Sequence, residues 1–141
     1  VELAVGVSRP GIYQFSDGLP WPAVISLTDL DCVRSSRLSA FPASPVSNGQ
    51  CLKLSCNSSN KPEIEVSWMS AAHRMALGFP LHPDRMSLDD WQALPGIGPR
   101  LAERIEKDRQ LNGDFVQVEH LRRVKGIGEG RVSLWRKFFY R

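Results

Sequence analysis

LPGIGPRLA at positions 94–102 returns as VKGIGEGRV at positions 124–132, and this repeat decides the fold of the C-terminal part of the chain. Gly96 and Gly126 are 30 positions apart. The same offset matches apolar residues on either side of the glycines: Leu88 with Val118, Trp91 with Leu121, Ala102 with Val132, and Ile105 with Trp135. Each copy therefore predicts a short apolar helix, a Gly-Ile-Gly turn and a longer amphipathic helix.

The two Gly-Ile-Gly turns are candidate anion sites. Glycine permits a sharp turn and a close approach of the backbone to a ligand, while Ile97 and Ile127 are expected to point into the helix–helix core. The N–H groups of the turn and of the next helix would then face outward, where they can bind a phosphate. Pro99 lacks an N–H donor, so the first turn is expected to bind more weakly. The candidate phosphate-binding residues are Gly96, Ile97, Gly98, Arg100, Arg104, Lys125, Gly126, Ile127, Gly128, Gly130 and Arg131.

The positive charge of the chain is confined to the same region. Residues 1–85 carry seven basic and seven acidic side chains, whereas residues 86–141 carry eleven and eight, which accounts for the whole net charge of +3. An excess of this kind indicates a polyanionic partner for the C-terminal part, although a solvated basic helix face has the same composition.

This pattern resembles the helix–hairpin–helix motif, present twice. The resemblance implies two motifs packed around a pseudo-twofold axis that bind both strands of a DNA duplex across the minor groove. Residues 87–139 also resemble the DNA-receptor domain of ComEA-like bacterial competence proteins, through GDF at 113–115, Leu121 and VKGIG at 124–128. One departure lies before the first short helix, where DRMS at 84–87 replaces the Asn-Thr-Ala-Ser that is frequent in that family.

Residues 1–69 are predicted to form a β-rich module. Alternating apolar side chains predict strands over residues 2–7, 51–56 and 63–68, the last two as a hairpin, and residues 21–30 fit a short helix. VGVSRPGIY at 5–13 and NGQCLKL at 48–54 resemble the opening and closing strands of the soluble-ligand-binding β-grasp (SLBB) family. That resemblance implies a β-grasp fold. It leaves open whether the module binds an unknown ligand or protein partner, or serves as a spacer or oligomerisation unit.

The fold class expected from these elements is α+β. We expect a β-grasp-like module over residues 1–69, a linker over 70–85 that includes a short helix at 70–77, and an all-α domain over 86–141. The last of these is expected to contain four helices in a tandem helix–hairpin–helix arrangement. Ser87 begins it with a capping-box-like sequence.

The other chemistry-bearing residues do not form the pattern of a metal site or an enzyme. The cysteines Cys32, Cys51 and Cys56 contain no C-x-x-C pair and the histidines are scattered, so no metal or other cofactor is expected. Buried free thiols are the expected state, and one disulfide, Cys51–Cys56 or Cys32 with either, is the alternative in an oxidising compartment. A DNA glycosylase of the helix–hairpin–helix superfamily can carry a nucleophilic lysine where this chain has Arg100, which stays protonated. We therefore expect no enzymatic activity.

The sequence predicts binding of double-stranded DNA through backbone phosphates and without sequence preference. A protein–protein adaptor that uses the hairpins to hold a partner is the alternative. The resemblance to competence proteins implies DNA capture or uptake outside the cytoplasm, in the periplasm or at a membrane anchor. No apolar run approaches the roughly 18–20 residues of a membrane span. Because the sequence begins at Val1, an upstream signal or anchor stays an open expectation.

Overall fold

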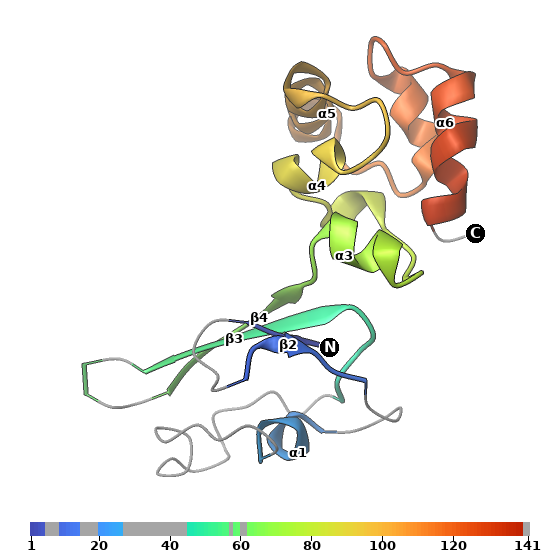
Figure 1. Cartoon of the computed structure of the whole chain (residues 1–141). Helices are drawn as coiled ribbons and strands as arrows, with labels where there is room; N and C mark the ends of the chain where they lie inside the picture. The colour runs from blue at the N-terminus through green and yellow to red at the C-terminus, as the bar shows by residue number, and fades with distance from the viewer. Residues whose placement is uncertain (5–8, 15–19, 27–44, 57, 60–61, 140–141) are drawn as a thin grey trace. The chain divides into compact units, whose positions relative to one another are not determined.

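A computed structural model describes residues 1–4, 9–14, 20–26, 45–56, 58–59 and 62–139 of the 141-residue chain. The chain divides into two compact units, Val1–Met69 and Ser70–Arg141. The protein is of mixed α and β structure, with the sheet in the first unit and most of the helix in the second (Figure 1).

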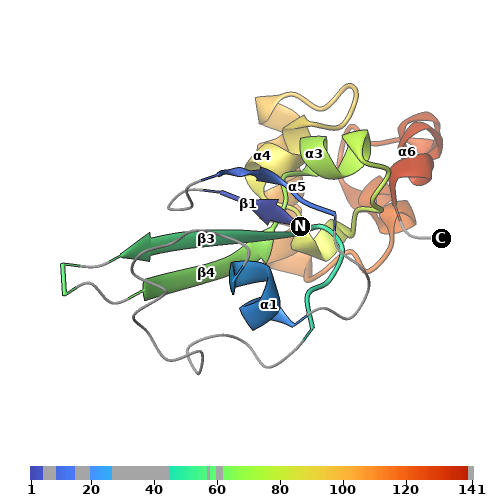
Figure 2. The same cartoon turned by 60° about the horizontal axis from the view of Figure 1, so that its bottom comes forward.

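The first unit contains a four-stranded mixed sheet with the order β2-β1-β3-β4 (Figure 2). Its strands are β1 (Glu2–Leu3), β2 (Gly11–Ile12), β3 (Gln50–Cys56) and β4 (Pro62–Trp68). β1 pairs antiparallel with β2 and parallel with β3, whereas β3 and β4 form the predicted hairpin with Leu52 opposite Val66. Of the strand predicted over residues 2–7, positions 5–7 lie outside the described residues.

The alternation along the strands decides which face of the sheet is buried. Leu52 and Leu54 are buried while Lys53 and Ser55 between and beside them are exposed, as a period of two requires. Helix α1 (Trp21–Ser26) contributes Val24 to the same core, which also includes Val1 and Leu3. The predicted helix extended to residue 30, but its positions beyond 26 lie outside the described part of the chain.

The expectation of buried free thiols is confirmed for one of the two described cysteines and is wrong for the other. Cys51 is a buried free thiol, and burial raises the pKa of this group above its ordinary value. Cys56 is disulfide-bonded, so the Cys51–Cys56 pairing is excluded. Cys32 lies outside the described residues.

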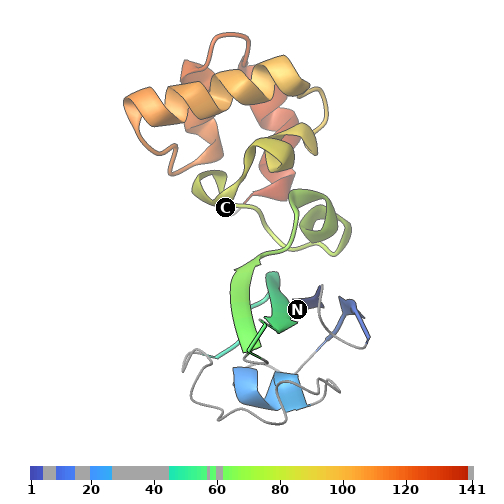
Figure 3. The same cartoon turned by 90° about the vertical axis from the view of Figure 1, so that its left-hand side faces the viewer.

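The second unit is helical (Figure 3). Its α-helices are α3 (Ala71–Ala76), α4 (Leu88–Gln92), α5 (Pro99–Asn112) and α6 (Glu129–Trp135), and its 3₁₀ segments are η2 (Pro83–Arg85), η3 (Val118–Arg123) and η4 (Arg136–Phe138). Apolar residues that the sequence repeat pairs are buried together in one core: Trp91 with Leu121, Leu94 with Val124, Ile97 with Ile127, Ala102 with Val132, and Ile105 with Trp135.

The third segment of the expected four-helix arrangement is a 3₁₀ helix. α4 begins with a complete capping box between Ser87 and Asp90, as its sequence predicts. Its counterpart η3 begins after Gln117, which makes no side-chain capping bond, and its first residue is the β-branched Val118. The missing cap and the stiffer side chain explain why the two related segments fold differently.

Residues 70–85, which the sequence treats as a linker, pack into the helical unit. Ala71 and Leu81 are buried in the same core as Trp91, and the N–H of Leu81 donates to the carbonyl oxygen of Phe138 at 2.7 Å. The helical unit therefore begins at Ser70. These apolar residues are too few and too irregularly spaced to give a periodic signal in the sequence.

Asp84 fixes the link between the two motifs. Its carboxylate accepts hydrogen bonds from the N–H groups of Phe115 at 2.8 Å and Val116 at 3.2 Å. Val116 has a φ of 59°, which is unfavourable for a β-branched residue and needs such support. Asp84, the first residue of the DRMS stretch that departs from the family sequence, thus has a structural role.

We expect Asp84→Ala to lower the free energy of unfolding by about 1–3 kcal/mol, because the partly buried N–H of Phe115 and the exposed N–H of Val116 lose their acceptor. Asp84→Asn keeps one acceptor oxygen and should cost less. Urea denaturation of the full chain measures both. An Asp84→Ala protein as stable as the parent would contradict this role.

A fragment of residues 70–141 is expected to unfold cooperatively, whereas 86–141 should be destabilised by several kcal/mol. The shorter fragment lacks Leu81, whose removal leaves a hole in the core, and also lacks the Asp84 carboxylate. Thermal unfolding followed by circular dichroism compares the two, and equal stability would place residues 70–85 outside the folded unit.

Candidate nucleic-acid interface

The two Gly-Ile-Gly turns have the same backbone conformation. Gly96 and Gly126 have positive φ angles of 80° and 101°. Gly98 and Gly128 are both extended, with φ and ψ of −100° and 176° in the first and −106° and 174° in the second. The sequence repeat is therefore a structural repeat, and the first glycine of each turn is required by its left-handed backbone.

The isoleucine between the glycines belongs to the core in both copies. Ile97 is 6% exposed and Ile127 is 5% exposed. Both were candidate DNA-binding residues, but the structure places their side chains beneath the turns, as expected for the central Ile. Their role is to anchor the turn against the core, and the flanking glycines stay on the surface.

Gly98 and Gly128 are not required by the protein's own packing. A Cβ atom built on either residue would have no heavy atom within 4 Å, and their extended backbone suits any residue. Each is the N-cap of the following helix, α5 or α6, and neither helix has a side-chain capping bond. Glycine at these positions therefore leaves open space in front of uncapped helical N–H groups.

The two turns border a common hollow of about 630 Å³. Its lining contains Arg100, Arg104 and Arg131 and, among the described residues, no carboxylate. Arg131 Nη1 donates to the carbonyl oxygen of Gly126 at 2.7 Å, and Arg104 Nη1 donates to that of Lys125 at 2.9 Å. The hollow is lined by the following residues: Gly96, Gly98, Pro99, Arg100, Leu101, Arg104, Gly126 and Arg131.

The hollow brings together six of the eleven candidate residues. Lys125, Gly128 and Gly130 are exposed but do not line it. Pro99 and Leu101 line it although the sequence did not single them out as site residues. In the sequence, Leu101 looks like an ordinary apolar position of an amphipathic helix. It lies beside Gly126 because one motif packs on the other.

Several basic side chains elsewhere in this unit are neutralised by acids. Arg109 pairs with Glu106, Arg122 with Glu129, Arg123 with Asp108, and Arg136 with Glu119. The Arg136 guanidinium holds the pKa of the Glu119 carboxyl below its usual range. In contrast, no ion pair is found for Arg100, Arg104, Lys125 or Arg131 within the described part of this unit. The three arginines that line the hollow therefore carry positive charge that no acid among the described residues neutralises.

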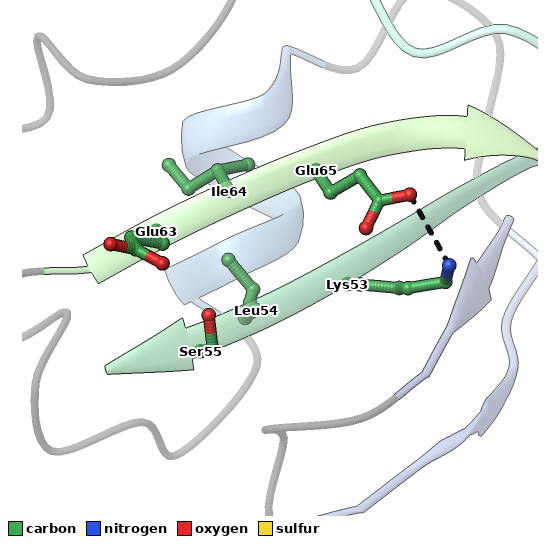
Figure 4. Close-up of a pocket in the computed structure, with 6 residues that line it drawn as sticks. All are labelled: Lys53, Leu54, Ser55, Glu63, Ile64 and Glu65. Atoms are coloured by element: carbon green, nitrogen blue, oxygen red, sulfur yellow. Dashed lines mark hydrogen bonds and ion pairs between the residues drawn. The ribbon is translucent and has the colours of Figure 1, made fainter. Parts of the chain in front are cut away.

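The described residues of the first unit form a second hollow, which presents fewer groups that could bind an anion. This shallow hollow over the β3–β4 hairpin is lined by Lys53, Ser55, Glu63 and Glu65 with two apolar residues, and Lys53 is paired with Glu65 at 3.2 Å (Figure 4). Among residues that the structure describes, no group of three or more His, Cys, Asp or Glu side chains could hold a metal ion. None of the helices in these residues is long and apolar enough to cross a membrane.

Comparison with known proteins agrees with this geometry. Residues 85–140 match the family model of the helix-hairpin-helix motif. ComE operon protein 1 of Bacillus subtilis (strain 168) is 42% identical over 43 residues, which cover 30% of this chain and 21% of that protein. The chain thus matches about a fifth of the length of this curated relative. These findings support the resemblance to the ComEA-like family, and residues 85–140 are a helix–hairpin–helix domain.

Proposed function

We propose that the helical unit binds double-stranded DNA through its backbone phosphates and without sequence preference. The observation that carries this proposal is glycine at positions 98 and 128, where neither the backbone angles nor the packing needs it. A ligand that comes close to the backbone explains both glycines. The uncapped N–H groups and the arginines without carboxylate partners make that ligand an anion.

A duplex fits better than a single small anion because the site is double. The two turns are structurally equivalent and border the same hollow, so each can donate N–H groups to a phosphate of a different strand. Contacts of this type fix the position of the protein on the duplex but do not read the bases. The domain would then act by binding alone, without an enzymatic step.

The proposed setting is DNA capture outside the cytoplasm, as the family resemblance implies. The disulfide at Cys56 supports it, because such bonds persist in oxidising compartments. We also propose that the first unit is an SLBB-like β-grasp module. The arrangement of the β1–β2 hairpin, α1, and β3 parallel to β1 supports that assignment.

Gly128→Thr tests whether glycine is needed at position 128 for DNA binding. Threonine is comparable with glycine as an N-cap, so the free energy of unfolding should stay within about 0.5 kcal/mol of the parent value. Its hydroxyl and methyl groups would occupy the space and the N–H donors reserved for a phosphate, and we expect duplex affinity to fall about tenfold, or 1.4 kcal/mol.

Fluorescence anisotropy with a labelled duplex measures this affinity. Ser133→Thr, at an exposed position further along α6, is the matched control and should bind like the parent. If Gly128→Thr is folded and binds DNA as tightly as Ser133→Thr, the second turn is not a phosphate site.

The salt dependence of binding distinguishes phosphate contacts from other forms of attachment. For the full chain, the logarithm of the affinity should fall linearly with the logarithm of the salt concentration, with similar slopes for duplexes of unrelated sequence. Arg100→Ala and Arg131→Ala should each weaken binding by about 1 kcal/mol or more and reduce the slope by about one unit.

Arg131→Ala should be the more damaging of the two, because it also removes the hydrogen bond to the Gly126 carbonyl oxygen. Lys137→Ala is the control from outside the hollow and should have the smallest effect. A salt-independent affinity, or binding to only one of the sequences, would contradict the proposed mode.

A further inference from the structure

Resting on the function proposed above, we propose that Arg104 is a positioning residue that acts through the other motif. It belongs to α5, the long helix of the first motif, but its Nη1 donates to the carbonyl oxygen of Lys125 at 2.9 Å, directly before Gly126 in the second turn. The same Nη1 would lie 3.2 Å from a Cβ on Gly126. Arg104 thereby holds the backbone of the second turn in place, although it lies 21 residues earlier in the chain.

The first turn is held in a related way from the opposite direction. Trp135 in α6 donates its indole Nε1–H to the carbonyl oxygen of Pro95 at 2.9 Å. Pro95 and Lys125 occupy equivalent places, each directly before the first glycine of its turn. Each hairpin is thus fixed at the same carbonyl by a side chain from the long helix of the other motif, so the two turns cannot shift independently.

Trp135 and Arg104, the two side chains that donate to the turn of the other motif, differ in their exposure to solvent. Trp135 is fully buried, whereas Arg104 is exposed and lines the hollow between the turns. In the second turn, Arg104 and Arg131 cover two consecutive carbonyl oxygens, those of Lys125 and Gly126. Carbonyl oxygens repel an anion, so binding them to guanidinium groups leaves the N–H side of the turn to dominate the local field.

Arg100 provides the matched comparison. It lies one turn before Arg104 on α5 and lines the same hollow, but no hydrogen bond of its side chain to the second turn is found in the described residues. If a place in the hollow were sufficient, both arginines would be expected to contact the same turn. Arg104 alone of the two has a hydrogen bond to the second turn, while Arg100 lies two residues after Gly98, at the start of the helix that follows the first turn.

Double-mutant cycles on the full chain test this assignment. Arg104→Met and Arg100→Met are each combined with Gly98→Thr and with Gly128→Thr, and duplex affinity is measured by anisotropy at one salt concentration. We expect Arg104→Met to lower affinity about tenfold. Its effect should largely disappear in the Gly128→Thr background and persist in the Gly98→Thr background, since coupled residues are non-additive and separated ones add. Arg100→Met should show the reverse pattern.

A second measurement needs no DNA. In ¹H–¹⁵N spectra of the free chain, Arg104→Met should shift the amide signals of Gly126 and Ile127 more strongly than Arg100→Met does. An Arg104 effect that is additive with Gly128→Thr, or amide signals that do not move, would overturn the positioning role. A parent chain that fails to bind duplex DNA would overturn the proposed function instead, and the amide shifts would then decide the role of Arg104 alone.

Discussion

The helical unit depends on one constraint, which is that neither copy of the repeat can bury its apolar residues alone. Trp91 and Trp135, one from each copy, lie fully buried in a single core, and Trp91 packs edge-on against Phe115 of the link between the copies. Their polar atoms are satisfied across the same core. Trp91 donates to Glu106 and Trp135 donates to the Pro95 carbonyl oxygen. Burial of both indoles in one core, together with the bond from Trp135 to Pro95, therefore fixes the two motifs against each other.

The shared core has a direct consequence for the surface. With Ile97 and Ile127 held beneath them, both turns keep their glycines on the surface, and Gly96, Gly98 and Gly126 line the common hollow. Arg109, Arg122, Arg123 and Arg136 elsewhere in the unit are paired with acids, whereas the arginines that line the hollow have no ion pair among the described residues. A domain with a net charge of only a few units can in this way concentrate its attraction for an anion at one place.

The first unit is built on a different principle. Its hairpin of β3 and β4 is long and regular, and the side chains alternate between a core with α1 and a polar face that carries the Lys53–Glu65 pair. The disulfide at Cys56 adds a covalent constraint to the end of β3. Small units bury a modest share of their surface, so a covalent link of this type is a common addition to their stability.

Much of this architecture could be predicted from local sequence signals. The exact spacing of the repeat determined the two turns, the buried isoleucines and the longer helices, because glycine in a left-handed turn and apolar residues at helical spacing are properties of a few neighbouring positions. The alternation in residues 51–56 and 63–68 likewise determined the hairpin, and Ser87 with Asp90 determined the start of α4. The candidate residues around both turns followed from the same repeat.

Only the tertiary structure decided how distant positions act on one another. It made residues 70–85 part of the helical core, and it placed the Asp84 carboxylate where it accepts hydrogen bonds from the N–H groups of Phe115 and Val116. It also separated arginines that look alike in the sequence, since Arg122, Arg123 and Arg136 are paired with acids while Arg104 reaches the opposite turn. These outcomes depend on which surfaces meet when two copies of one motif share a core, and that geometry is not a property of any short stretch of sequence.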